Sequence, residues 1–455
     1  MAPLPLVSPP LENSNFNLDI FSVAGFFGGD EVLESMSTIH LTDGRKWRGW
    51  YNSPGAYTVA KSVGRIANSQ FWRGLFPGSC QDPASSFGLD GKKGPEYMAV
   101  LSGTKMTSGY MGYLLAQHVK HYPEVTNLFD GESRTTKNTG VTIIDIQDVR
   151  HLPHLSSQSS TFHLLLSYFT MISSIACAIF CLILFDDKFC FTAILLGTII
   201  GGISTLIIGM GTLTLQTVFQ PAPGSPPGDG VLVGEEFIVL RGKEGHVNAI
   251  TKGKFHLKLK GAPKYHIIGI CSVLYFLQFI VQLFLIPQGH LIGQIMFLSS
   301  FAISWIYNGA IASIDKEAKQ AKLLKKSVTM DIKKYTLPNR TRAVVFTCLS
   351  LRRSLEEIEQ SPVYSDFNPE SLLKSMLPND TRVWHKWRSV VKDILLRNQD
   401  PQYFDDALDD EDMADLREDQ RNLLSTLLKD AKCAYKMYHN ISDYTDPRTK
   451  SLTEK

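Results

Sequence analysis

The sequence predicts an integral membrane α-helical protein with a four-helix transmembrane bundle made of two hairpins. Four apolar runs carry this prediction, and none of them contains Asp, Glu, Lys or Arg: residues 162–185, 189–215, 267–287 and 291–314. Each run is long enough to cross the roughly 30 Å hydrocarbon layer, which takes about 20 helical residues. Very short connectors join the first run to the second and the third to the fourth, so we expect transmembrane hairpins at 161–215 and 266–314.

Composition and motif spacing exclude several functional classes. The net charge of +2 argues against a general nucleic-acid-binding protein, although 20% of the 455 residues are charged. Seven cysteines occur without a CxxC pair, so no zinc site or thioredoxin-like motif is predicted. Phosphate-binding loops, dinucleotide-binding fingerprints and nucleophile elbows are also missing. We therefore predict no catalytic residues, no metal and no cofactor.

The N-terminal part divides into a disordered lead at 1–20 and a mixed α/β cytosolic region at 21–160. Prolines dominate the lead. The Asp43-Gly44 dipeptide predicts a two-residue hairpin turn between strands over 38–51, since such turns need a positive φ. Helices are expected at 57–68 and 108–122, and a strand at 141–149. Whether this region folds independently is left open.

Charge placement predicts the orientation of the bundle. An even number of spans puts both termini and the central loop on one side of the membrane. That side carries seven basic residues between 241 and 264 and seven lysines between 316 and 334, so the positive-inside rule predicts that it faces the cytosol. Glycosylation sequons at Asn339, Asn379 and Asn440 would suit a lumenal tail instead. The lysines carry more weight here.

Small and polar residues within the spans predict how the helices pack. The second run has a small-residue stripe at i+4 spacing, which lets another chain segment approach closely: Gly197, Gly201, Thr205 and Gly209. Its partner, within this chain or in a homo-oligomer, is left open. Gln282 and Gln294 lie at similar distances from the turn of the second hairpin, so we expect an interhelical contact between their amides. Ion-coupled transport is disfavoured, because no ionisable residue lies at depth.

The central loop, residues 216–265, is predicted to hold a Pro/Gly linker followed by a small, basic antiparallel β-meander. Its last run alternates apolar and basic residues, which places Phe255, Leu257 and Leu259 on one sheet face. The opposite face carries Lys254, Lys258 and Lys260. Each lysine near an anionic leaflet contributes about 1 kcal/mol, so we expect this face to lie against anionic headgroups.

The tail, residues 315–455, is predicted to be cytosolic and mainly helical. Asn368-Pro369 is a helix start signal, with a capping residue before Pro at the first helical position. Another helix should run over about 409–439, with acidic residues at its front and lysines at its end, as the helix dipole favours. These amphipathic helices are candidate docking elements for protein partners.

Three functions remain in order of preference. The leading interpretation is a non-enzymatic membrane scaffold or adaptor that organises cytosolic partners. The alternative is a subunit of an oligomeric channel or transporter, and the third is a membrane-bound enzyme. The sequence names no substrate and no particular organelle.

Overall fold

The computed structural model describes residues 25–78, 82–128, 136–150, 155–216, 221–352, 367–397, 403–406 and 416–445. The predicted lead and the front of the predicted 409–439 helix lie outside these residues. The chain packs into two compact units. The bundle unit draws on residues up to 91, 151–215 and 255–323, and the sheet unit on 92–150, 216–254 and the residues from 324 onward. Each unit combines three stretches of chain, whereas the predicted domains follow one another along the sequence.

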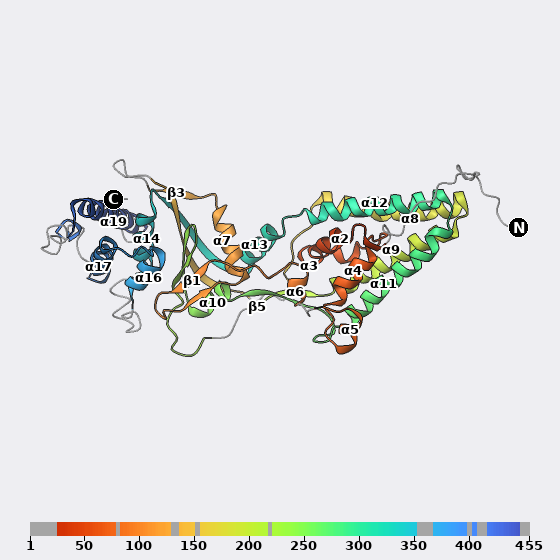
Figure 1. Cartoon of the computed structure of the whole chain (residues 1–455), viewed down its shortest axis with the longest axis horizontal. Helices are drawn as coiled ribbons and strands as arrows, with labels where there is room; N and C mark the ends of the chain where they lie inside the picture. Colours follow the sequence, from red (N-terminus) through yellow and green to blue (C-terminus); the bar gives the residue numbers. More distant parts are fainter. Residues whose placement is uncertain are drawn as a thin grey trace, which may run out of the picture. The chain divides into compact units, whose positions relative to one another are not determined.

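Four helices in the bundle unit are long and apolar enough to cross a membrane, as predicted. They are α8 (Thr161–Phe185), α9 (Lys188–Gly209), α11 (His266–Leu285) with the short η2 (Ile286–Gln288), and α12 (Leu291–Ala312). Figure 1 shows them running side by side. The second predicted run is too long at its C-terminal end, because residues 212–216 form strand β5. Two glycines flank Met210 there, and alternating threonine and leucine follow, a pattern that favours a strand over a helix.

Asp187 ties the two hairpin turns together at one end of the bundle. Its Oδ1 accepts a hydrogen bond from the backbone N–H of Cys190 at 3.0 Å and so caps α9. Its Oδ2 accepts from the backbone N–H of His290, 2.8 Å away in the other turn. One carboxylate thus satisfies donors in both hairpins.

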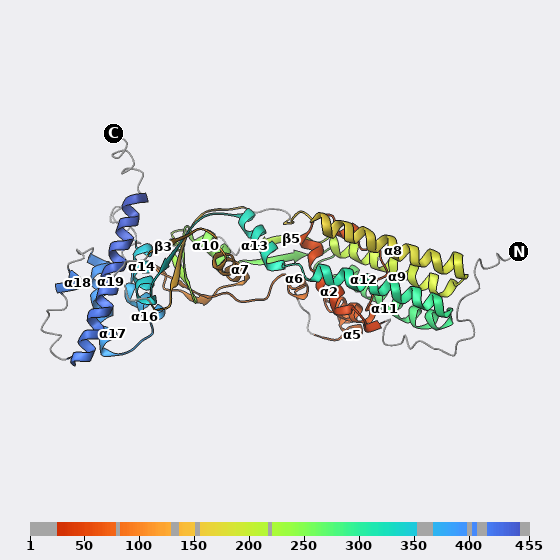
Figure 2. The same ribbon diagram turned by 90° about the horizontal axis from the view of Figure 1, so that it is seen from above.

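Helical elements of the N-terminal region pack against this bundle. They are α2 (Gly29–Met36), α3 (Thr38–Leu41), η1 (Arg45–Trp47), α4 (Ala56–Gly64), α5 (Gln70–Leu75) and α6 (Pro83–Ser86). Figure 2 shows α2 beside the long helices, where it packs on α12. Helix α4 packs on α11, and η1 packs on α9.

The predicted hairpin over 38–51 is wrong. Gly44 does adopt a positive φ of 71°, but the residues beside it form α3 and η1 instead of strands. All four residues of α3 are buried. A strand with one solvated face would have exposed every second residue, so burial on all sides favours the helix.

The sheet unit is built on a seven-stranded mixed sheet with the strand order β2-β1-β6-β7-β4-β9-β3. Its strands are β1 (Glu96–Ala99), β2 (Lys105–Thr107), β3 (Val125–Asn127), β4 (Thr139–Val149), β6 (Gly230–Val233), β7 (Phe237–Arg241) and β9 (Val328–Leu337). The predicted strand at 141–149 is confirmed as part of β4, an interior strand of this sheet. Strand β4 runs parallel to β7 and antiparallel to β9. Segments before, between and after the hairpins therefore share one sheet.

Helices cover both faces of this sheet. Figure 1 shows α7 (Tyr110–Lys120) and α10 (Glu244–Thr251) on one face. On the other face α14 (Arg340–Leu351) packs on the strands. Behind it, packed on α14 or on one another, lie α16 (Pro369–Met376), α17 (Arg382–Arg397), α18 (Tyr403–Asp406) and α19 (Glu418–Thr445). Helix α14 is buried from its second residue to its last, and Trp387 of α17 is fully buried in the same apolar cluster. Asn368 caps α16 at Pro369 as predicted.

The predicted β-meander in the central loop is wrong as an independent element. Strands β6 and β7 do form an antiparallel hairpin, but it is an integral part of the larger sheet. Residues 247–251, which lie within the predicted meander, are helical and belong to α10. Strand β8 (Lys254–Lys258) pairs with β5 in a separate two-stranded sheet. Short apolar runs do not distinguish a strand from a buried helix by periodicity alone.

Candidate functional site

Residues 48–55 enter the interior of the bundle as an irregular segment held by polar side chains. The backbone N–H of Asn52 donates to Ser174 of α8 at 3.2 Å, and its side-chain Nδ2 donates to Ser300 of α12 at 2.8 Å. Gln278 of α11 donates to the carbonyl of Ser53 at 3.0 Å. Non-helical backbone inside an apolar bundle needs such partners, because an unpaired buried polar group costs free energy.

The predicted small-residue stripe of α9 faces this inserted segment. An added Cβ at Gly197 would overlap Asn52, and one at Gly201 would lie 3.0 Å from the carbonyl oxygen of Tyr51. Thr205 contacts Gly49, and Gly209 contacts Lys46. The close approach expected of the stripe is therefore made by residues 46–52 of the N-terminal region. Gly197 lies 12 residues before Gly209, the last residue of α9. At about 1.5 Å per helical residue, its neighbour Asn52 lies about 18 Å into the bundle from that end.

The two glutamines of the second hairpin bond to different groups, which corrects the predicted Gln282–Gln294 contact. Gln282 Nε2 donates to the carbonyl of Ala193 at 3.1 Å. Gln294 Nε2 donates to the carbonyls of Ile286 and Gly289, both at 3.2 Å, and so closes its own turn. The carbonyls of Ile286 and Gly289 lie at the end of a helix and lack α-helical partners. They are nearer to the Gln294 amide than the Gln282 amide on the facing helix is.

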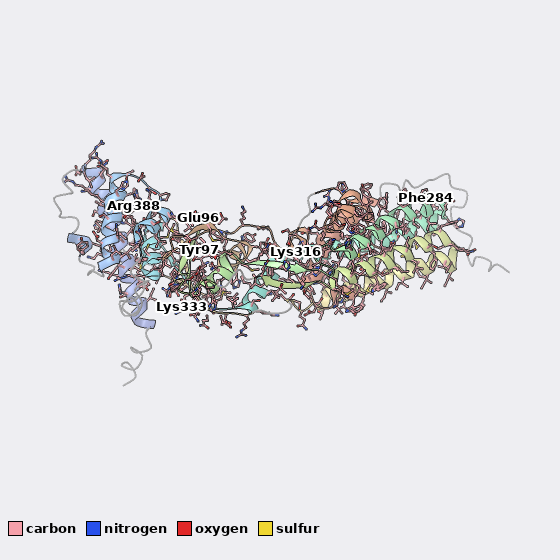
Figure 3. The ribbon with its side chains drawn as sticks, turned by 90° about the horizontal axis from the view of Figure 1, so that it is seen from below. Glu96, Tyr97, Phe284, Lys316, Lys333 and Arg388 are labelled. Carbon is pink, nitrogen blue, oxygen red and sulfur yellow. The ribbon has the colours of Figure 1, made fainter. Side chains whose placement is uncertain are left out.

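A pocket lies where the N-terminal segment meets the ends of α8 and α12. Its free volume is about 10 Å³, room for about one water molecule. Its lining is formed by Thr42, Arg45, Arg48, Ser159, His163, Ser167, Ile311, Ile314 and Lys319. Four of these side chains are basic and none is acidic. In Figure 3 Lys316, which begins the helix that carries Lys319, lies at the opposite end of the bundle from Phe284.

Each cation of the pocket is positioned by neutral groups. Arg45 is only 6% exposed, and its guanidinium lies 5.7 Å from the centroid of the Tyr307 ring. Arg48 donates to Ser159 Oγ at 3.1 Å. Lys319 Nζ donates to Thr42 Oγ1 at 3.1 Å. Among the residues that the structure describes, Arg45, Arg48 and Lys319 form no ion pair with a carboxylate.

The electrostatic consequence is visible at Lys319. Burial, together with the positive charges of Arg45 and Lys322, lowers the pKa of the Lys319 ammonium below its usual value. Burial and like charge both disfavour the charged form of an amine. The pocket therefore concentrates positive charge without internal compensation. No carboxylate lines the pocket, so the pocket offers no Asp or Glu for acid–base catalysis.

Sequence analysis did not identify these pocket residues. Lys319 is far from Arg45 and Arg48 in the sequence, and none of the three stands out from its local pattern. The signal that could have been used is the run Arg45–Tyr51, which mixes basic and aromatic residues as membrane interfaces do. The predicted lysine row was found from its alternation. Lys254, Lys258 and Lys260 are exposed, while Phe255, Leu257 and Leu259 are buried, so that pattern is confirmed.

Comparisons with known proteins add no function. No family model matches the chain, no curated protein matches it, and no solved structure matches it. Functional inference therefore rests on the sequence and the structure alone.

Proposed function

We propose that this chain is a four-span membrane protein that acts as a non-enzymatic scaffold, with a non-conducting bundle as its anchor and the sheet unit as its partner-binding part in the cytosol. The observation that carries this proposal is the inserted segment. Asn52 bonds to side chains of α8, α11 and α12 at once, so protein fills the place where a conduit would run. A channel or transporter needs a hydrated path or an ionisable group at depth.

The distribution of charge supports cytosolic termini. The cationic pocket lies at the bundle end where α8 begins and α12 ends, and the lysine-rich α13 (Lys316–Ser327) follows α12 there. Positive charge on connecting segments favours the cytosolic side. One of the three sequons that would suit a lumenal tail, Asn339, is not accessible to a glycan in the folded chain. Asn339 is 2% exposed and its Nδ2 donates to Asp430 at 3.0 Å, so the folded tail has no room for a glycan there.

The purified full-length chain should give no solute flux. We expect liposomes that contain it to leak protons, potassium and chloride at the rate of protein-free liposomes, because the bundle interior is occupied. Fluorescent indicators inside the vesicles provide the measurement. Gramicidin in matched vesicles serves as the positive control for protons and potassium, and a chloride ionophore serves for chloride. A protein-dependent flux that scales with the amount of reconstituted chain would overturn the non-conducting anchor and favour the channel alternative.

A scaffold should also contact its partners through defined surfaces of the sheet unit. Two exposed apolar side chains on its helices are candidates, Leu396 on α17 (46% exposed) and Leu423 on α19 (40% exposed). A photoreactive residue at position 423 or 396 is expected to cross-link a specific protein in native membranes. The same residue at Ser102, exposed in the β1–β2 turn, is the matched control. Equal cross-linking from all three positions, or none from any, would contradict the scaffold proposal.

A further inference from the structure

Helices α2 and α4 fill a gap in the wall of the bundle. The two helices of the second hairpin, α11 and α12, meet at their turn, where Asp187 joins both hairpins. Towards the other end α4 packs on α11, α2 packs on α12, and α2 packs on α4. Figure 1 shows α11 and α12 diverging in this direction, with α2 and α4 between them. The two N-terminal helices therefore complete the bundle on this side.

Glycines bring the starts of these two helices close to each other and to α11. An added Cβ at Gly55, the residue before α4, would overlap the backbone of Gly29 at the start of α2. An added Cβ at Gly25 would overlap the ring of Phe279 on α11. Small residues that allow such close approach are typical of helix packing in membranes.

Contacts along α11 give the depth of α4 in the bundle. Phe279 lies 13 residues after the first residue of α11, which is about 20 Å along the helix axis. The centroid of the Tyr57 ring, in the first turn of α4, lies 5.5 Å from that of the Phe279 ring. Beyond the other end of α4, the backbone N–H of Asn68 donates to the carbonyl of Lys264 at 3.1 Å. Helix α4 therefore runs from the middle of α11 back to its start.

Two aromatic side chains are exposed at the deep end of this pair of helices. Phe26 is 58% exposed, and its ring centroid lies 5.2 Å from that of Tyr57, which also contacts the exposed Phe276 of α11. Phe27 is 39% exposed, and its ring centroid lies 5.6 Å from that of Trp305, an exposed residue of α12. The exposed apolar surface thus continues from α11 across the N-terminal segment to α12.

Charged residues follow this apolar surface towards the end of the bundle. Asp30 and Glu31 lie in the first turn of α2, and Trp305 Nε1 donates to Glu31 Oε1 at 2.9 Å. Glu34, one turn further, forms an ion pair with Lys316 beyond the end of α12. Tryptophan is enriched at the level of the headgroups. Apolar residues before α2 and charged residues within it are the order expected of a segment that enters one leaflet from its headgroup side.

We propose that α2 and α4 insert as a wedge into the leaflet at the bundle end where α8 begins and α12 ends, and that Phe26 and Phe27 contact its acyl chains. Lys61, the only charged residue of α4, lies one turn nearer the headgroups than Tyr57, and a lysine side chain is long enough to extend towards them. This inference rests on the proposal that the bundle spans a membrane. It adds that part of the N-terminal region predicted to be cytosolic lies within the bilayer and broadens the bundle in one leaflet.

Phospholipids with a diazirine in the middle of an acyl chain test this contact. The full-length chain is reconstituted in liposomes with these lipids and irradiated, and mass spectrometry locates the adducts. We expect Phe26 and Phe27 to be labelled as strongly as Phe284, an exposed residue of α11. Leu423 of the sheet unit is the matched control, because its exposed fraction of 40% is close to that of Phe27. It should show only background labelling.

Phe284 separates failure of the wedge from failure of the membrane anchor. If Phe284 stays at the background level of Leu423, the bundle does not span the bilayer and both proposals fail. If Phe284 is labelled and Phe26 and Phe27 are not, water, a second copy or another segment of the chain covers them. That result would overturn the wedge alone.

A pair of substitutions at Phe26 tests its surroundings independently of its packing. Phe26→Asp and Phe26→Asn remove the same ring and introduce side chains of nearly the same shape, but only the first introduces a carboxylate. We expect Phe26→Asp to unfold in liposomes at a temperature at least about 5 °C below that of Phe26→Asn, because a charge at this depth loses its hydration. Leu423→Asp and Leu423→Asn should unfold at the same temperature as each other. The same equality for the Phe26 pair would refute the wedge.

Discussion

Replacing Asp430 by Ala is expected to lower the free energy of unfolding of the sheet unit by roughly 3–5 kcal/mol. Asp430 and Arg342 form an ion pair between α19 and α14, with 3.0 Å between Asp430 Oδ1 and Arg342 Nε. Both side chains are only 4% exposed. The same carboxylate oxygen accepts from Asn339 Nδ2. Removing the carboxylate leaves a buried guanidinium without compensation, and this costs more than the intact pair contributes.

Asp405→Ala is the matched control for that substitution. Asp405 pairs with Lys432, but its side chain is 57% exposed, so its loss should cost no more than about 1 kcal/mol. The double variant Arg342→Met, Asp430→Leu should recover much of the stability, because a well-packed apolar pair often replaces a buried ion pair at little cost. Pulse proteolysis of the detergent-solubilised chain in urea measures each variant. Equal losses for Asp430→Ala and Asp405→Ala would refute the prediction.

Gly49→Ala should expel the inserted segment from the bundle or lower the stability of the bundle unit by about 1–3 kcal/mol, the usual cost of overpacking. An added Cβ at Gly49 would overlap the Cβ of Thr205, which belongs to the small-residue stripe of α9. A Cβ atom is fixed by the backbone and does not rotate away. Thermal unfolding in detergent measures the loss of stability, and hydrogen–deuterium exchange of the Asn52 backbone amide, which donates to Ser174, reports whether the segment leaves the bundle.

A second substitution and a control make this prediction specific. Thr205→Gly removes the overlapping atoms, so the double variant Gly49→Ala, Thr205→Gly should regain stability that Gly49→Ala loses. Gly309→Ala on α12 is the matched control, because an added Cβ there meets nothing within 4 Å. If Gly49→Ala unfolds at the same temperature as Gly309→Ala, the segment is not held in the bundle as described.

Local patterns were sufficient for the elements that depend on local properties. Hydropathy located all four long helices, and alternation correctly separated the buried Phe255 and Leu257 from the exposed lysines of β8. The capped start of α16 also followed from adjacent residues. Residues 212–216 were assigned wrongly, because threonine and leucine extend an apolar run without continuing a helix. The same ambiguity of short apolar runs affected α10.

Long-range pairing explains what local patterns missed. Asn52 bonds to Ser174 and Ser300, which follow it by 122 and 248 residues. The stripe on α9 indicated close approach, but many segments could have supplied the partner. Strands β4, β7 and β9 come from three separate stretches, and nothing in any one strand specifies that they are neighbours. The pocket has the same origin, since its cations become neighbours only after the N-terminal segment packs on α8 and α12.

The sequence alone determined that the chain has four helices apolar enough to span a membrane, grouped as two hairpins, with an excess of positive charge on one set of connections. Each of these properties depends only on residues that are close together in the sequence, so it can be determined without knowing the fold. Tertiary structure decided that the N-terminal region enters the bundle, that three stretches form one sheet, and that Arg45, Arg48 and Lys319 share a pocket. Those outcomes depend on which buried polar groups satisfy one another across hundreds of residues, and only the folded chain specifies these pairs.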